Sequence, residues 1–250
     1  MKTAIITGAS TGVGLEFVRQ IKNVFPEIEE FWVIARRLDR LQQIEIPGVS
    51  IKPLALDLTA PDSFAALQAE LQACAPNVQL LVGNAGCGYL GNFDESSLDE
   101  QLRMVDLNIR ALTAVTRLVL PYVEQGGHMI HMSSIASFVP NPRMTVYSAT
   151  KSYVSAFSRG LHEELKSRNI SVTAVCPGPM DTEFIRLGRI KGESKTFDVL
   201  PYCIPEQVVR GALLAAKKGR AVYTPKLLYK TYRVLSSLIP HAIFVKFAGT

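Results

Sequence analysis

The sequence predicts an α/β fold in which a doubly wound parallel sheet of about seven strands carries helices on both faces. Three observations support this prediction. Short apolar runs alternate with segments of helical length along nearly the whole chain. A glycine-rich turn between residues 7 and 14 follows the first apolar run. The 250 residues are 48% hydrophobic, which is enough to bury a large core.

Each expected strand is a short apolar run bounded by polar or turn-forming residues. The expected strands are Ala4–Thr7, Phe31–Ala35, Ile51–Leu56, Leu80–Val82, His128–Met132, Ser171–Cys176 and Ala221–Thr224. Many of these runs are apolar at consecutive positions, as in strands that are covered by helices on both sides of a parallel sheet.

The expected helices connect these strands. They are Gly14–Val24, Pro61–Cys74, Leu98–Leu120, Thr145–Ser167 and Pro205–Lys218. Pro121 ends the third of them, because proline cannot continue the helical hydrogen bonding. Right-handed crossovers through such helices bring the carboxyl ends of the strands to one edge, where sheets of this kind bind ligands.

No linker or internal repeat divides the chain, so we expect a single domain over residues 1–250. Residues 183–203 are rich in Gly, Lys and Arg, and we expect an irregular substrate loop there. Residues 225–250 form a C-terminal tail that mixes apolar and basic residues. A subunit interface or the roof of a pocket is the favoured role of this tail, and contact with a membrane surface is the alternative.

The composition excludes several classes of protein. The net charge of +5 is modest and dispersed, so we expect no nucleic-acid partner. No apolar run has the length of a membrane span, and the run after Lys2 is too short for a signal peptide. Four cysteines without a Cys-x-x-Cys pair, and four histidines without metal-binding spacing, predict no metal site and a reducing, cytoplasmic location.

Tyr147 and Lys151 form the most specific chemical pattern. Residues four apart lie on the same face of a helix, so the ammonium and the phenol are neighbours. A nearby cation stabilises a phenolate and lowers the phenol pKa from its ordinary value of about 10. The pair therefore predicts an acid/base group, and the Ser134 hydroxyl can hold the reacting oxygen beside it.

The turn from Thr7 to Gly14 reads Thr-Gly-Ala-Ser-Thr-Gly-Val-Gly and lies between the first strand and the first helix. Glycines permit a tight turn and close backbone approach. The helix N-terminus beyond them can receive a pyrophosphate. This position predicts a dinucleotide-binding loop.

The residues after the second strand, Arg36 and Arg37, favour NADP(H) over NAD(H). An acidic residue usually occupies this position in sites that prefer NAD, and none is present here. A guanidinium can pair with the 2′-phosphate of NADP instead, and Ser10 can add a hydroxyl. Either arginine can also be a solvated surface residue; we assign the contact to Arg36.

Together these features resemble the short-chain dehydrogenase/reductase family over about residues 1–225. Gly83 is a departure, since a second asparagine is common there in the family. The matching positions are Thr7–Gly14, Asp57 and Leu58, Asn84-Ala85-Gly86, Asn108, Ser134, Tyr147, Lys151 and the segment from Pro177 to Thr182.

The resemblance implies a Rossmann-like fold and hydride transfer between a nicotinamide cofactor and a small-molecule carbonyl or alcohol. It makes Asn108, Ser134, Tyr147 and Lys151 catalytic, with Tyr147 transferring the proton and Asn108 orienting a water. The cofactor-binding residues that it implies are Gly8, Ser10, Thr11, Gly12, Val13, Gly14, Arg36, Asp57, Leu58, Asn84, Ala85, Gly86, Tyr147, Lys151, Pro177, Gly178 and Thr182.

Several alternatives stay open at this level. A non-catalytic regulatory protein can keep the same NAD(P)-binding fold. The family favours a homodimer or homotetramer through the two long helices, but their apolar residues can equally pack on the sheet. Asp57 can be a strand-end cap. The expected pocket residues Tyr89, Val139 and Met144 do not identify a substrate.

Overall fold

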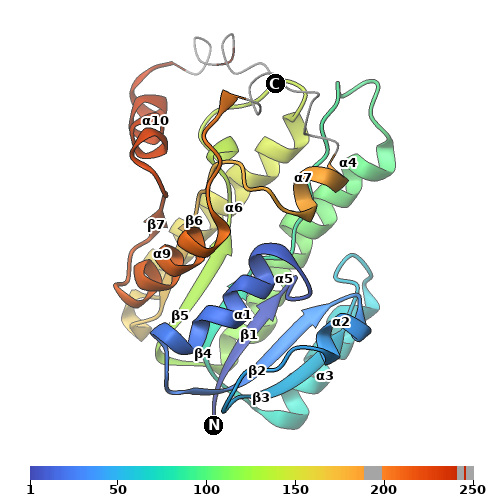
Figure 1. Cartoon of the computed structure of the whole chain (residues 1–250), viewed down its shortest axis with the longest axis vertical. Helices are drawn as coiled ribbons and strands as arrows, with labels where there is room; N and C mark the ends of the chain where they lie inside the picture. The colour runs from blue at the N-terminus through green and yellow to red at the C-terminus, as the bar shows by residue number, and fades with distance from the viewer. Residues whose placement is uncertain (189–198, 241–244, 246–250) are drawn as a thin grey trace.

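Seven parallel strands form one sheet, in the order β3-β2-β1-β4-β5-β6-β7 (Figure 1). The computed structural model describes residues 1–188, 199–240 and 245. The strands are β1 Lys2–Thr7, β2 Ile28–Ala35, β3 Ser50–Ala55, β4 Asn77–Gly83, β5 Val123–Met132, β6 Ser171–Val175 and β7 Val222–Tyr223. The predicted doubly wound sheet is confirmed.

Helices cover both faces of this sheet. On one face, α1 Gly12–Val24 and α9 Pro205–Lys217 pack side by side, and α2 Leu38–Gln42 adds Leu41 to the same core. On the other face lie α3 Asp62–Cys74, α5 Leu112–Val119 and α6 Thr145–Glu164. The remaining helices are α4 Leu98–Val105, α7 Glu183–Leu187 and α10 Leu227–Leu238.

The central strands are apolar on both sides, because each side contacts a helical layer. Ile6 of β1 packs in the core with α1 and α9, whereas its neighbour Ile5 packs in the core with α3 and α5. Both side chains have no exposed surface. The alternation of side chains along a strand therefore divides one apolar run between two cores.

Four local features differ from the expectation. The predicted helix 98–120 is interrupted by a π-helical turn at Asp106–Ala111, which separates α4 from α5. Helix α2 was not predicted, since five residues show too little periodicity. Helix α7 forms inside the segment predicted to be irregular, while residues 189–198 lie outside the described residues. In the tail, 12 residues form α10.

The apolar residues of the predicted helix 98–120, one of the two helices expected at a subunit interface, divide between two environments. Leu112, Val115 and Val119 of α5 are buried, and the two valines pack in the core of the sheet. Leu102 and Val105 of α4 are exposed. In the part of the chain that the structure describes, no helix has both the length and the apolarity to cross a bilayer.

Candidate functional site

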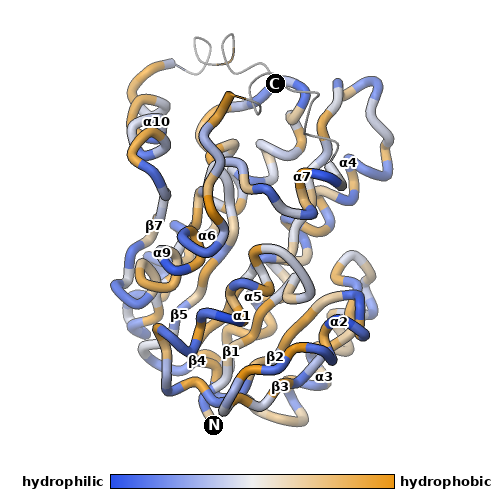
Figure 2. Tube along the Cα trace, viewed as in Figure 1, coloured by the Kyte–Doolittle hydropathy of each residue, from blue (hydrophilic) through white to orange (hydrophobic). Residues whose placement is uncertain are grey.

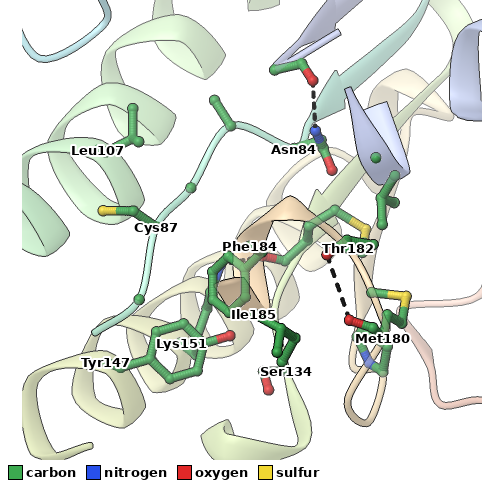
Figure 3. Close-up of a pocket in the computed structure, with 18 of the residues that line it drawn as sticks. Asn84, Cys87, Leu107, Ser134, Tyr147, Lys151, Met180, Thr182, Phe184 and Ile185 are labelled. Carbon is green, nitrogen blue, oxygen red and sulfur yellow. Dashed lines mark hydrogen bonds between the residues drawn. The ribbon is translucent and has the colours of Figure 1, made fainter. Parts of the chain in front are cut away.

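A cavity of about 620 Å³ lies at the carboxyl ends of the central strands. It extends from the glycine loop, past β2 and β4, to α6 and the segment before α7. Every predicted catalytic or cofactor residue lines it except Gly14 and Asn108. Figure 3 shows Asn84, Cys87, Ser134, Tyr147, Lys151 and Thr182 around this space. Predicted residues up to 174 positions apart in sequence, from Gly8 to Thr182, thus converge there.

The glycine loop is closed by contacts that exclude larger side chains. Gly8 and Gly12 have φ values of +67° and +53°, in the left-handed region that favours glycine. Gly14 lies behind the loop, where an added Cβ would approach the Gly8 carbonyl oxygen to 2.0 Å. Gly14 is therefore required for close packing of α1 on β1, and it does not face the cavity.

Asn84 holds this loop from the end of β4. Its side-chain amide donates to the Thr7 carbonyl oxygen at 3.0 Å, and its backbone N–H donates to Thr7 Oγ1 at 3.0 Å. The same amide also donates to the Gly8 carbonyl oxygen at 3.4 Å, as the dashed line in Figure 3 shows. These bonds tie the end of β4 to the end of β1, which fixes the floor of the cavity.

Asp57 both caps a local turn and lines the cavity. Its carboxylate accepts from the Thr59 N–H at 3.0 Å and from Thr59 Oγ1 at 2.7 Å. Burial opposes ionisation, but the bonds from Thr59 prevail and hold the pKa of Asp57 below its ordinary value. The alternative role of Asp57 as a cap is therefore seen in the structure. Asp57 nevertheless also lines the cavity.

The two arginines after β2 have different environments. Arg37 pairs with Glu183 of α7, at 3.0 Å between Nη2 and Oε2, and also donates to Thr11 Oγ1 at 3.4 Å. Arg36 is exposed and lines the cavity close to Asp57. Among the described residues, Arg36 has no carboxylate within ion-pair distance of 4.0 Å.

Tyr147 and Lys151 lie one turn apart on the buried face of α6. The Lys151 ammonium is 5.7 Å from the centre of the Tyr147 ring and donates to the Met132 carbonyl oxygen at 2.9 Å. Both side chains are nearly inaccessible to solvent. The predicted shared face is confirmed.

Burial dominates the ionisation of this pair. It raises the pKa of Tyr147 to about 12, while a hydrogen bond with Ser134 acts in the opposite direction. It also lowers the pKa of the Lys151 ammonium to about 8. The predicted lowering of the phenol pKa is thus wrong, because desolvation of the phenolate outweighs the hydrogen bond with Ser134.

The two adjacent serines after β5 have separate roles. Ser134 lines the cavity, and its hydroxyl oxygen accepts from the Ala136 N–H at 3.1 Å as a cap of the following 3₁₀ turn. The Ser133 hydroxyl donates to the Lys151 carbonyl oxygen at 2.8 Å. Ser133 therefore anchors α6 to the end of β5.

Asn108 lies in the π-helical turn and is buried behind the cavity wall. Its Oδ1 accepts from the Cys87 N–H at 2.9 Å, and its Nδ2 donates to the Cys87 carbonyl oxygen at 2.8 Å and to Thr150 Oγ1 at 3.0 Å. Asn108 thereby fixes the loop after β4 against α6. Irregular turns of this kind recur at functional sites.

Helix α7 covers the acid/base pair. The ring of Phe184 lies 5.7 Å from the ring of Tyr147, centre to centre, and Figure 3 shows the two side by side. Ile185 is 2% exposed and packs in the same cluster. The sequence did not predict that Phe184 and Ile185 cover Tyr147. Their position depends on where the segment after Thr182 crosses the cavity, which no local pattern shows.

The expected substrate residues are only partly correct. Tyr89 and Met144 line the cavity, whereas Val139 is 1% exposed and is not among the lining residues. Its backbone carbonyl instead accepts from the Asn141 side chain at 2.7 Å. Lining residues that the sequence did not single out include Cys87 and Arg103.

The start of the C-terminal tail contributes to the cavity wall. Tyr229 of α10 packs against Gly178, and its hydroxyl donates to the Pro201 carbonyl oxygen at 2.7 Å. The pocket-roof role considered for the tail is thus seen for α10. Among residues 1–188, 199–240 and 245, no group of three His, Cys, Asp or Glu residues is arranged to hold a metal ion.

Comparisons with known proteins agree with this arrangement. A family model for short chain dehydrogenases matches residues 2–189. An uncharacterized oxidoreductase of Staphylococcus saprophyticus is 36% identical over 191 residues, covering 73% of this chain and 75% of the relative. Serine 3-dehydrogenase of Agrobacterium fabrum is 32% identical over 205 residues, covering 79% of each chain.

A solved structure supports the same conclusion. The short-chain dehydrogenase from Sphingobium yanoikuyae, in complex with NADPH, is similar with a TM-score of 0.80 and 29% identity, over 96% of each chain. With its parallel sheet, glycine loop and Tyr147–Lys151 pair, the chain belongs to the short-chain dehydrogenase family and is an oxidoreductase of that family.

Proposed function

We propose that this protein is an NADP(H)-dependent oxidoreductase that interconverts a carbonyl and a secondary alcohol, with Tyr147 as the acid/base group. One observation carries the proposal. Ser134, Tyr147 and Lys151 meet on the wall of the same cavity that the glycine loop borders. A dinucleotide and a carbonyl can therefore share one space.

The residues present fit the cofactor. Neighbouring atoms leave no room for a Cβ at Gly8 or Gly14. No side chain of these two residues therefore covers the backbone between the end of β1 and the N-terminus of α1. Such a cradle suits a pyrophosphate. The residues that would hold the rest of the molecule are Ser10, Thr11, Gly12, Val13, Arg36, Asp57, Leu58, Asn84, Ala85, Gly86, Pro177, Gly178 and Thr182.

When bound, the cofactor supplies or accepts the hydride, and the protein supplies the proton. With a pKa of about 12, the Tyr147 phenol is protonated at neutral pH and ready to donate to a carbonyl oxygen as it becomes an alkoxide. Ser134 donates a second hydrogen bond to that oxygen. The raised phenol pKa favours the reducing direction, because it preserves the donor form.

Lys151 completes the proton path. Its ammonium has a pKa of about 8, so most of it remains charged at pH 7, beside the phenolate left by proton donation. Asn108 holds the backbone at Cys87 and orients the water through which Lys151 recovers a proton. Proton transfer of this kind contributes about 10²- to 10⁴-fold to the rate.

The preference for NADP(H) rests on Arg36. Arg37 is engaged with Glu183, whereas Arg36 is exposed at the cavity rim and has no ion-pair partner among the described residues. The Arg36 guanidinium is therefore the group available to a 2′-phosphate. The structure of the similar Sphingobium yanoikuyae enzyme holds NADPH.

The substrate is a bulky apolar ketone or aldehyde. Met144, Phe184, Ile185, Leu228 and Tyr232 line the cavity near Tyr147 and the C-terminal helix. A charged group placed against these five side chains would lose water without gaining a partner. That loss costs several kcal/mol (about 2–7) for even a neutral polar group.

Quaternary structure and location complete the proposal. Leu98, Leu102 and Val105 of α4 are 70%, 52% and 39% exposed, and we assign them to the interface of a homodimer or homotetramer. Light scattering should report a smaller assembly for Leu102→Glu. All four cysteines are free, which suits a reducing cytoplasm.

The test of activity is Tyr147→Phe, measured on a panel of hydrophobic ketones and aldehydes with NADPH. Turnover should fall by about 10²-fold or more, while NADPH binding, followed by its fluorescence, stays near wild type. Tyr153→Phe is the matched control, since Tyr153 is on the same helix and bonds Thr113 instead. Activity retained by Tyr147→Phe would exclude this proton donor. A wild-type protein that binds NADPH but reduces no panel member would support the non-catalytic alternative.

Arg36→Asp tests the cofactor preference. It should reduce kcat/KM with NADPH by about tenfold or more and change the NADH value much less. Arg210→Asp, which changes an exposed arginine of α9, is the control for added negative charge. Wild-type preference for NADH would contradict the assignment.

A further inference from the structure

Helix α10 is held to the protein by only one of its faces. Tyr229 and Ser236 are 1% and 5% exposed, and the ring of Tyr232 lies 5.9 Å from that of Phe138. In Figure 1, α10 stands at the margin of the molecule, beyond β7. The opposite side of the helix therefore faces outward.

That outward side is an apolar stripe. Leu227, Leu228, Val234, Leu235 and Leu238 are 78%, 54%, 51%, 42% and 74% exposed. Their spacings of four and seven residues place them on one continuous face. Figure 2 shows hydrophobic residues recurring along this helix. Single exposed apolar residues are ordinary, but five on one helix face mark an interaction surface.

Basic residues flank the stripe, and acidic ones are absent from this part of the sequence. Residues 207–250 contain eight Lys or Arg and no Asp or Glu, so the other 206 residues carry a net charge of −3. Lys226 and Lys230 are both exposed, one turn apart, beside the stripe. The surface that α10 presents is thus apolar in the middle and cationic at its edge.

We propose that the outer face of α10 binds the surface of an anionic phospholipid bilayer. The five apolar side chains enter the interface between headgroups and acyl chains, and Lys226 and Lys230 lie at the level of the lipid phosphates. Charge favours this occupant over a second copy of the chain. Two copies joined through the stripe would bring like-charged lysines together.

The cavity lies directly behind this surface. Leu228 belongs to the exposed stripe and also lines the cavity, as do Tyr229 and Tyr232 of the same helix. A lipid-dissolved apolar molecule therefore reaches the cavity along α10. The membrane contact itself does not depend on the proposed catalytic activity.

The experiment is flotation of the full-length protein with vesicles of phosphatidylcholine alone or with about 30% phosphatidylglycerol. The protein should bind the anionic vesicles at least about tenfold more tightly, and added salt should weaken that binding. Lys226→Gln with Lys230→Gln should remove most of the preference for anionic lipid. Leu227→Gln with Leu238→Gln should lower binding to anionic vesicles by about tenfold or more.

The matched control is Ile204→Gln with Leu214→Gln, which makes the same change at two exposed apolar residues at the start of α9 and within it. It should leave vesicle binding unchanged, and circular dichroism should show that all variants remain folded. Absence of wild-type binding to anionic vesicles would overturn the proposal, as would an equal loss in the Ile204 and Leu214 control. The wild type could instead bind no vesicles and self-associate, with the self-association lost only in the α10 leucine variant. That result would identify a second copy of the chain as the occupant of the stripe.

Discussion

His131 makes the stability of the fold depend on pH in the acid range. It lies on β5, three residues before Ser134, and has no exposed surface. The Ser158 hydroxyl donates to the Val154 carbonyl oxygen at 2.7 Å, so it accepts from Nδ1 of His131 at 2.9 Å. We therefore assign the neutral tautomer in which Nε2 accepts from Thr116 Oγ1, at 3.3 Å.

The expected magnitude follows from the change in pKa. Burial lowers the pKa of His131 from 6.5 to about 4 in the folded protein. The unfolded chain thus binds a proton first as pH falls, and stability is lost between pH 6.5 and 4. At about 1.36 kcal/mol per pKa unit, the loss from pH 7 to pH 4.5 is about 2.4 kcal/mol, and it approaches about 3.4 kcal/mol well below pH 4.

Urea unfolding of the wild type and of His131→Gln, at pH 7 and at pH 4.5, measures this loss of unfolding free energy. Glutamine keeps a donor and an acceptor but does not titrate, so the variant should lose about 2.4 kcal/mol less than the wild type over that range. Ser158→Ala is the control: it weakens a hydrogen bond at both pH values and keeps the histidine titration. An identical pH dependence in His131→Gln and wild type would refute the reasoning.

Three other predictions concern the cavity. Glu183→Gln removes the ion pair with Arg37, so stopped-flow displacement should show NADPH release about two- to fivefold faster. That bond holds the pKa of Glu183 near 2, so the ratio of variant to wild-type release rates should be the same at pH 7 and pH 5. Gly14→Ala forces a Cβ to 2.0 Å from the Gly8 carbonyl oxygen, and should lower stability by about 1–3 kcal/mol and weaken NADPH binding in a fluorescence titration; wild-type affinity would contradict the close-packing role. Asn108→Leu leaves the Cys87 backbone groups without their partner and should cost about 1–3 kcal/mol in urea unfolding, whereas an unchanged midpoint would show that these bonds contribute little.

Much of the architecture was predictable because it depends on local pattern. Each of the seven strands coincides with an apolar run, and the helices between them follow from length and periodicity. Helix α2 and the π-helical turn at Asp106–Ala111 were missed, since five or six residues are too few for periodicity to show. Helix α7 was missed because nothing in Glu183–Leu187 separates a covering helix from a loop.

The sequence by itself determined the order of the elements, the glycine loop and the placement of Tyr147 and Lys151 on one helix face. These depend on backbone conformation and on residues within a turn of each other. Only the tertiary structure decided that Arg37 pairs with Glu183, 146 positions away, and that the pKa of Tyr147 rises to about 12. Ion pairs between distant segments and the loss of water around a buried group depend on what the folded chain places beside them, and spacing along the sequence does not contain that information.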